Sequence, residues 1–155
     1  MSQPGPWELL QAAHSMTERS WAPYSRFRVG AALLSASGAL FRACNVENAS
    51  YGLSLCAERA AVAAAVAAGE RDLVALAVWG ERSAQEPSGP CLPCGACRQV
   101  LAEFCSPEFL VWTVGGDGLP EAWTLKDLLP AAFTLSPPTK GAAEARRAGT
   151  GGDGV

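Results

Sequence analysis

Hydrophobic residues near the start of the chain recur at the spacing of an α-helix. One row contains Trp7, Leu10 and Ala13, and the next contains Leu9, Ala12 and Met16. Pro6 suits the first turn of a helix, whereas Pro23 is incompatible with a helix interior. The pattern predicts an amphipathic helix over residues 6–20, ending before Pro23.

Two short runs with strand character follow, at residues 26–34 and 39–46. The segment between them, Ser35-Ala36-Ser37-Gly38, ends in a glycine that can supply the positive φ of a tight connection. The two runs therefore predict a β-hairpin.

The next element is an alanine-rich helix over residues 57–68. After Arg59 it contains no charged residue and no residue larger than valine. Alanine has the highest helix propensity, and Gly69 is well placed to end the helix. A helix that is apolar all round has to be buried all round. We expect one face to pack on a sheet and the other to pack against a neighbouring subunit.

The second half of the chain alternates strand and helix patterns. The run at 73–79 is almost continuously apolar, which is typical of a central strand buried on both faces. Further elements are predicted as a helix at 98–104, a strand at 109–114, an antiparallel return at 122–124 after a glycine-rich turn, and a short helix from Thr124 to Leu129. This order predicts an α/β domain around one mixed sheet.

At 155 residues the chain has room for a single domain, which we place at residues 1–135. Residues 136–155 are rich in Ala, Gly, Arg and Glu after a proline pair, a composition typical of a disordered tail. The chain is 49% hydrophobic and only 17% charged, which suggests that partner subunits cover part of its surface.

Charge and hydropathy narrow the range of partners. The net charge is −3 and no stripe of Lys and Arg is visible, so nucleic-acid binding is not expected. No apolar run reaches the roughly 18 residues that a membrane span needs, and the first residues do not resemble a secretion signal. We therefore expect a cytoplasmic protein that does not bind membranes.

The six cysteines indicate a metal site. They lie at positions 44, 56, 91, 94, 97 and 105, so three fall within seven residues. In a reduced compartment such clustering favours metal binding over disulfides. Cys94 and Cys97 share one face at a predicted helix start, and Cys56 stands at another, where the helix dipole favours thiolates. Three ligands would leave a tetrahedral zinc ion one open position.

Charged residues beside these cysteines suggest catalysis. Glu58 lies two positions after Cys56, where a carboxylate that does not bind the metal could move the protons of a bound water. Arg59 and Arg98 directly follow the ligand segments and could donate hydrogen bonds to the sulfurs. The alternative, an exposed helix arginine, is less favoured for Arg59 and equally favoured for Arg98.

Two alternatives remain open on spacing alone. Cys91 could complete a closed four-cysteine structural site, although Leu92-Pro93 separates it from the helix start and such a site does not explain Glu58. Asn45 and Glu47 would point to the same side in extended geometry, but they could simply be solvated residues at a strand end. His14, the only histidine, excludes most histidine-dependent chemistry.

The motifs together resemble the small homotetrameric cytidine deaminases. Cys-Ala-Glu at 56–58 and Pro-Cys-Gly-Ala-Cys at 93–97 match the zinc deaminase pattern in its all-cysteine form. The resemblance spans roughly residues 5–134 and includes Ala22 to Ala32, Asn45 to Tyr51, Pro93 to Gln99 and Leu128-Leu129-Pro130.

The resemblance implies a three-layer α/β/α fold with a mixed five-stranded sheet, one zinc ion per subunit and a homotetramer. Cys56, Cys94 and Cys97 would be the zinc ligands, and Glu58 would shuttle protons. Nucleoside-binding residues would be Phe27 against the pyrimidine, Asn45 and Glu47 at the ribose 3′-hydroxyl, Ala57 at the base, and Ala49, Tyr51 and Phe133 reaching a neighbouring subunit's site. Residues 134–138 depart from the family pattern, and Cys91 is not a family ligand.

The implied activity is hydrolytic deamination of cytidine and 2′-deoxycytidine in pyrimidine salvage. A deaminase acting on bases within RNA or DNA would need a basic groove, which this acidic chain lacks. Deaminases of the antibiotic blasticidin S share the zinc motifs, but the match across residues 45–51 favours cytidine.

Overall fold

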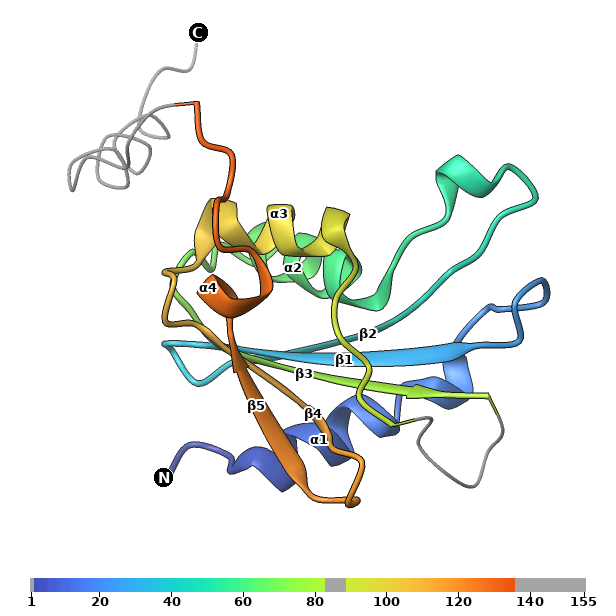
Figure 1. Cartoon of the computed structure of the whole chain (residues 1–155), viewed down its shortest axis with the longest axis horizontal. Coiled ribbons are helices and arrows are strands. Elements are labelled where there is room, and N and C mark those ends of the chain that lie inside the picture. The colour runs from blue at the N-terminus through green and yellow to red at the C-terminus, as the bar shows by residue number, and fades with distance from the viewer. Residues whose placement is uncertain (1, 83–88, 136–155) are drawn as a thin grey trace, which may run out of the picture.

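A five-stranded sheet with helices on both faces forms the body of the protein (Figure 1). The computed structural model describes residues 2–82 and 89–135. The strands are β1 (Arg28–Ser35), β2 (Leu40–Cys44), β3 (Leu73–Glu81), β4 (Leu110–Val114) and β5 (Pro120–Thr124), in the order β2-β1-β3-β4-β5. Strands β3 and β4 are parallel and the other neighbouring pairs are antiparallel, so the predicted mixed sheet is confirmed.

The helices divide unequally between the two faces of the sheet. Helix α1 (Pro6–His14) covers one face. Helices α2 (Ala57–Ala67), α3 (Gly95–Phe104) and α4 (Leu125–Leu128) lie on the other, which gives the three layers that were expected (Figure 1).

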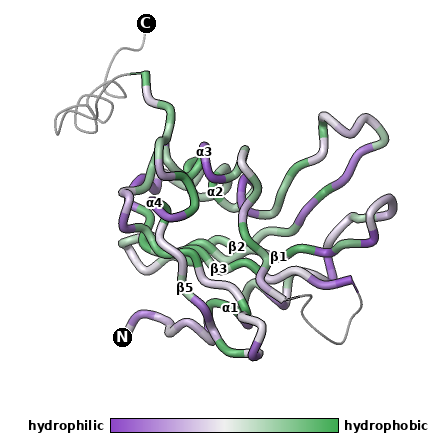
Figure 2. Tube along the Cα trace, viewed as in Figure 1, coloured by the Kyte–Doolittle hydropathy of each residue, from purple (hydrophilic) through white to green (hydrophobic). Residues whose placement is uncertain are grey.

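Alternation along β1 creates two separate apolar cores. Ala31 and Leu33 face α2 and α3, whereas Ala32 and Leu34 face α1. Because successive side chains of a strand point to opposite faces, one strand supplies both cores. Figure 2 shows hydrophobic residues along the central strands of the sheet, with polar residues mainly toward the loops.

Helix α1 is shorter than predicted, since it ends at His14 and is followed by a 3-10 turn at Thr17–Arg19. The Ser15 hydroxyl donates to the Ala12 carbonyl over 2.7 Å, which competes with continuation of the helix. The helix end presses on β1 at Gly30, where an added Cβ would lie 1.8 Å from the Ala13 carbonyl oxygen.

Several strand boundaries also differ from the prediction, including the start of β5 at Pro120 instead of Ala122. Strand β1 begins at Arg28 rather than Arg26, because Arg26 adopts a left-handed backbone with φ 57°. Strand β2 ends at Cys44, and β3 continues to Glu81, where it still pairs with Arg28. The short C-terminal helix starts as predicted, with the Thr124 hydroxyl accepting a hydrogen bond from the Asp127 amide.

The outer face of α2 is exposed in the single chain. Ala57, Ala61 and Ala65 are buried against the sheet, whereas Ala63 and Ala64 are exposed. Burial of this helix on every side therefore depends on a surface outside the chain, and the predicted subunit interface stays a prediction.

Two predicted segments cannot be compared with the structure. Residues 83–88 of the polar loop between β3 and Cys91, and the tail at 136–155, lie outside the described residues. In the part of the chain that the structure describes, no helix combines the length and the apolar character needed to cross a bilayer.

Candidate active site

Cys56 and Cys94 occupy equivalent positions at the starts of two adjacent helices. Cys56 is the N-cap of α2 and Cys94 the N-cap of α3, both with extended backbones. Cys97 lies one turn into α3 and is fully buried. The free N–H groups and dipoles of both helices favour negatively charged sulfur here, as predicted.

The three sulfurs form a cluster that fits a zinc ion. The Cys56 and Cys94 sulfurs are 3.8 Å apart, those of Cys94 and Cys97 are 3.6 Å apart, and all three lie within 4.8 Å of one another. Three sulfurs arranged tetrahedrally at zinc–sulfur distances of about 2.3 Å would be separated by about 3.8 Å. The donor set and its spacing therefore suit zinc.

Cys91 does not belong to this cluster. Its backbone N–H donates to the Thr113 hydroxyl over 2.8 Å, and its sulfur lies against the backbone of Gly80. Burial raises the pKa of the Cys91 thiol to about 12, which keeps it protonated. The cluster that could hold the metal therefore offers three sulfurs, and Cys91 does not complete a four-cysteine set.

The thiols of the cluster share their protons unequally. A hydrogen bond with Cys97, aided by the Arg59 guanidinium, lowers the pKa of Cys56 to about 5 despite partial burial. The same hydrogen bond, together with burial, raises the pKa of Cys97. One thiolate is thus favoured even without a metal, and a zinc ion would replace the remaining protons.

Glu58 is the buried carboxyl group beside the cluster. It is 5% exposed in the first turn of α2, and burial raises its pKa to about 7. The negative charge of Cys56 acts in the same direction, while its own backbone N–H opposes the shift. A carboxyl group with a pKa near neutrality is suited both to accept and to donate a proton.

The two arginines that follow the ligands have different partners. One terminal nitrogen of Arg59 lies 3.8 Å from the Cys56 sulfur and 3.2 Å from the Ser54 carbonyl oxygen. Arg98 instead donates from Nε to the Pro93 carbonyl and from a terminal nitrogen to the Leu128 carbonyl, both over 2.7 Å. Arg59 thus balances sulfur charge, whereas Arg98 ties the start of α3 to the end of α4.

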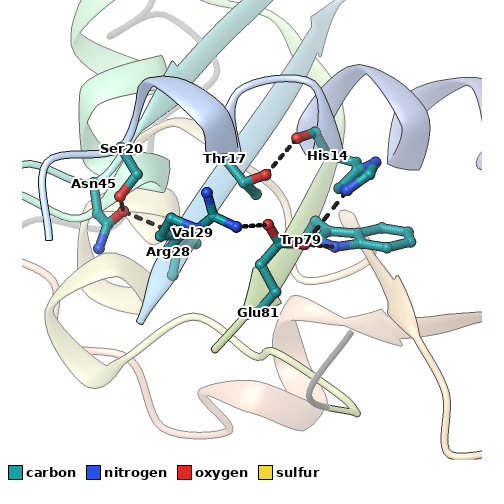
Figure 3. A network of polar contacts seen from close by, with 8 residues as sticks. All are labelled: His14, Thr17, Ser20, Arg28, Val29, Asn45, Trp79 and Glu81. Carbon is teal, nitrogen blue, oxygen red and sulfur yellow. Dashed lines mark hydrogen bonds and ion pairs between the residues drawn. The ribbon is translucent and has the colours of Figure 1, made fainter. Parts of the chain in front are cut away.

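Asn45 joins the loop before β1 to the end of β2. Its Oδ1 accepts hydrogen bonds from the Val29 amide at 2.9 Å and from the Ser20 hydroxyl (Figure 3). Its Nδ2 donates to the Phe27 carbonyl over 2.9 Å. Asn45 therefore fixes the backbone of Phe27, the residue expected to pack against the base.

Glu47 also holds the loop before β1, at Tyr24 and Ser25. Its carboxylate accepts from the Tyr24 amide at 2.9 Å, from the Ser25 amide and from the Ser25 hydroxyl. The Ser25 hydroxyl, followed by these backbone amides, keeps the pKa of Glu47 below its ordinary value. Glu47 and Tyr51 also line one groove of about 390 Å³, so the polar pair is not merely a solvated strand end.

The Phe27 ring occupies a narrow position. An added Cβ at Gly80 would lie 2.6 Å from the ring and 2.6 Å from the Cys91 sulfur, so both side chains rest on the same stretch of backbone. Arg82 lies over the ring, 5.7 Å from its centroid. The tip of the ring therefore rests on the backbone of β3 at Gly80.

The remaining predicted residues are spread between the core and the surface. Ala57 is fully buried at the start of α2, whereas Ala49 is exposed. Tyr51 is 74% exposed and packs edge-on against Tyr24, and Phe133 is 69% exposed. A single chain therefore leaves Tyr51 and Phe133 on the surface.

Two residues that sequence reasoning did not single out contribute to the site. Ser25 binds Glu47 through both its hydroxyl and its amide, and Gln99 donates from Nε2 to the Phe133 carbonyl over 2.9 Å. Both lie inside segments of the family motif, and their polarity beside Phe27 and Cys97 was the available signal. Their hydrogen-bond partners are distant in sequence, so nothing in the sequence indicated which residues would pair.

Comparison with known proteins agrees with this geometry. Residues 7–113 match the family profile described as "Cytidine and deoxycytidylate deaminase zinc-binding region". The cytidine deaminase of Halalkalibacterium halodurans is 46% identical over 126 residues, which cover 81% of this chain and 92% of that protein.

Solved structures are similar as well. The cytidine deaminase of Burkholderia pseudomallei is 48% identical, with a TM-score of 0.72 over 81% of this chain and 96% of that one. The cytidine deaminase of Mycobacterium tuberculosis is 41% identical, with a TM-score of 0.70 over 85% of this chain and all of that one. Together with the three-sulfur cluster and the buried Glu58, these matches show that the chain belongs to the zinc-dependent cytidine deaminase family.

Proposed function

We propose that this protein deaminates cytidine and 2′-deoxycytidine hydrolytically, forming uridine or 2′-deoxyuridine and ammonia. The observation that carries the proposal is the buried Glu58 carboxyl group, with a pKa of about 7, beside three sulfurs spaced for zinc. Bound zinc supplies the positive charge that makes a water molecule acidic enough to act as a nucleophile at neutral pH.

Glu58 acts as the proton carrier of the reaction. It accepts the proton that the attacking water loses and delivers it to ring N3 of the base. It then takes the remaining proton of the added hydroxyl group and passes it to the amine, which leaves as ammonia while the C4 carbonyl forms. The overall balance is one nucleoside and one water giving one deaminated nucleoside and one ammonia. Burial suits Glu58 to this role, because a pKa near 7 makes both of its protonation states accessible.

The nucleoside lies along the loop before β1. The held Phe27 ring packs against the pyrimidine, Ala57 adjoins the base, and Asn45 and Glu47 bind the ribose 3′-hydroxyl. The geometry supports this because Asn45 fixes the Phe27 backbone and Glu47 lines the neighbouring groove. The acceptor atoms of Asn45 and Glu47 also hold the loop that precedes β1 and carries Phe27. The pair therefore sets the position of the sugar relative to the base.

A homotetramer completes the pocket. Ala49, Tyr51 and Phe133 reach a neighbouring subunit's site, which accounts for two large aromatic side chains that are exposed in the single chain. The exposed alanines of α2 provide the close contact between subunits. The deaminase domain spans residues 1–135, and the enzyme serves pyrimidine salvage in the cytoplasm.

The test is a parallel ultraviolet assay of the purified enzyme with cytidine, deoxycytidine, cytosine and CMP. We expect turnover of both nucleosides and little turnover of the free base or the nucleotide. The matched variant Glu58→Gln keeps the size of the side chain but cannot carry a proton, so we expect about a 10²- to 10⁴-fold fall in kcat with zinc content unchanged. Ammonia release by this variant at the wild-type rate would refute the role of Glu58.

A further inference from the structure

A second groove opens beside the residues that join α1 to β1. Its volume is about 500 Å³, and its lining contains Ser20, Trp21 and three arginines, Arg26, Arg28 and Arg82. None of the described residues that line it is acidic. In a chain with a net charge of −3, three arginines lining one groove are a local exception.

Arg28 is held in place from the protein interior. It donates to the Glu81 carboxylate over 2.8 Å, and Glu81 is only 1% exposed (Figure 3). The Trp79 indole N–H, at 3.2 Å, and His14, at 3.4 Å, also face that carboxylate (Figure 3). Arg28 lies on the α1 side of the sheet, because Val29 faces the core formed with α2 and α3.

Arg26 extends from a strained loop. Its φ of 57° is a conformation that non-glycine residues rarely adopt, and its amide donates to the Ala22 carbonyl over 3.0 Å. The Glu47 carboxylate fixes the two preceding residues, Tyr24 and Ser25. The position of Arg26 is therefore set by the fold, unlike that of an arginine on a free surface loop.

Arg82 links this groove to the Phe27 ring. Its guanidinium lies 5.7 Å from the ring centroid, and it makes no ion pair with any described residue. Of the three arginines only Arg28 forms an ion pair, so two arginines of the lining have no acidic partner among the described residues. Trp21, 60% exposed, adds an aromatic wall.

We propose that this groove binds the phosphate group of a small phosphate monoester. Guanidinium groups match phosphate oxygens in geometry and charge, and two unpaired positive charges suit the dianion of a monoester at neutral pH. Trp21 offers contact area to the organic part of an ester that inorganic phosphate lacks. The binding site is separate from the zinc cluster and does not depend on the proposed reaction.

The test is calorimetric titration of the zinc-loaded wild-type enzyme at low ionic strength with ribose 5-phosphate and, separately, inorganic phosphate. We expect saturable binding of one ester per chain, with inorganic phosphate weaker. The double variant Arg26→Gln/Arg82→Gln should bind the ester at least about tenfold more weakly, since two charge-assisted contacts are lost. Arg42→Gln, which changes an exposed arginine on β2, should bind like the wild type.

Several outcomes would overturn the proposal. These are the absence of saturable binding to the wild type, equal binding by the double variant, and displacement of the ester by excess uridine, which would place it at the nucleoside site. Affinity for a single-stranded oligonucleotide that grows with its length would assign the groove to nucleic acid instead. Circular dichroism checks folding, and Arg82→Gln alone serves if the double variant does not fold.

Discussion

The zinc-binding centre and the exposed hydrophobic rim of the candidate site are built in opposite ways. The centre consists of Cys56, Glu58, Cys94 and Cys97, which lie at the starts of two packed helices and include two of the buried residues of the chain. The rim consists of Tyr24, Tyr51, Leu53 and Phe133, all more than half exposed. The single chain thus contains all the chemical groups of the centre, whereas the side chains of the rim remain on its surface.

The centre and the rim are therefore stabilised by different contacts. The centre is held by helix packing within the chain, so its geometry exists before any partner arrives. Full burial of a large apolar side chain is worth about 1.5–3 kcal/mol, and the single chain realises only part of that gain at each rim residue. The centre is therefore expected to respond to changes in chemistry, and the rim to changes in association and substrate affinity.

The largest effect is expected from loss of a zinc ligand. Cys97→Ser replaces a fully buried sulfur of the cluster with a poorer ligand. We expect zinc loss, a fall in kcat of at least about 10³-fold, and a loss of about 3 kcal/mol in the free energy of unfolding, since zinc stabilises only the folded state. Metal analysis, the nucleoside assay and denaturant unfolding measure the three quantities.

The matched control is Cys105→Ser, which changes another cysteine at the end of α3. Burial raises the pKa of Cys105 to about 12, so this sulfur is not a thiolate at neutral pH. The control should keep both its zinc and its activity. Equal zinc loss in the two variants would show that the cluster depends on general packing of α3 and would remove the distinction between centre and rim.

Much of the fold was predictable because its signals are local. The apolar run at 73–79 identified a central strand, Thr124 identified the start of α4, and the antiparallel return of β5 was expected from the glycine-rich turn. The errors lie where a tertiary contact overrides a local pattern. Helix α1 ends early at a close approach to Gly30, and the left-handed backbone of Arg26 delays β1.

The candidate site divides in the same manner. The spacing of Cys94 and Cys97 and the position of Glu58 after Cys56 indicated the zinc-binding centre, because helix geometry brings together the groups within each helix, although the meeting of the two helices depends on tertiary packing. The attachment of Glu47 to Ser25 and of Gln99 to Phe133 joins residues more than 20 positions apart. Such pairs depend on the packed loops, and no periodicity in the sequence encodes them.

A smaller effect is expected at the rim. Phe133→Ala removes an aromatic side chain that is 69% exposed, while Gln99 still anchors the backbone of residue 133. We expect KM for cytidine to rise about tenfold, equivalent to about 1.4 kcal/mol, with kcat changed much less and the subunit assembly weakened. Steady-state kinetics and native mass spectrometry give the two readouts.

Leu119→Ala provides the comparison for Phe133. Leu119 is also exposed, at 57%, but it lies in the turn between β4 and β5, away from the zinc-binding centre. It should leave KM and assembly unchanged. A wild-type KM in Phe133→Ala, or an equal effect in both variants, would mean that the rim does not complete the pocket.

The smallest effect concerns Glu47, whose carboxylate holds the loop that carries Tyr24 of the rim. Hydrogen bonds from Ser25 and Tyr24 lower the pKa of Glu47 below its ordinary value near 4.5. The lowered pKa means that the folded loop favours the ionised form, so its contribution to stability is complete above that ordinary value and is lost as the pH falls through the depressed pKa. The amide resonances of Tyr24 and Ser25, followed by NMR, should therefore shift together with a midpoint below pH 4.5. In Glu47→Gln they should stay constant over the same range, and a midpoint above 4.5 in the wild type would show that these amides do not hold the ionised carboxylate.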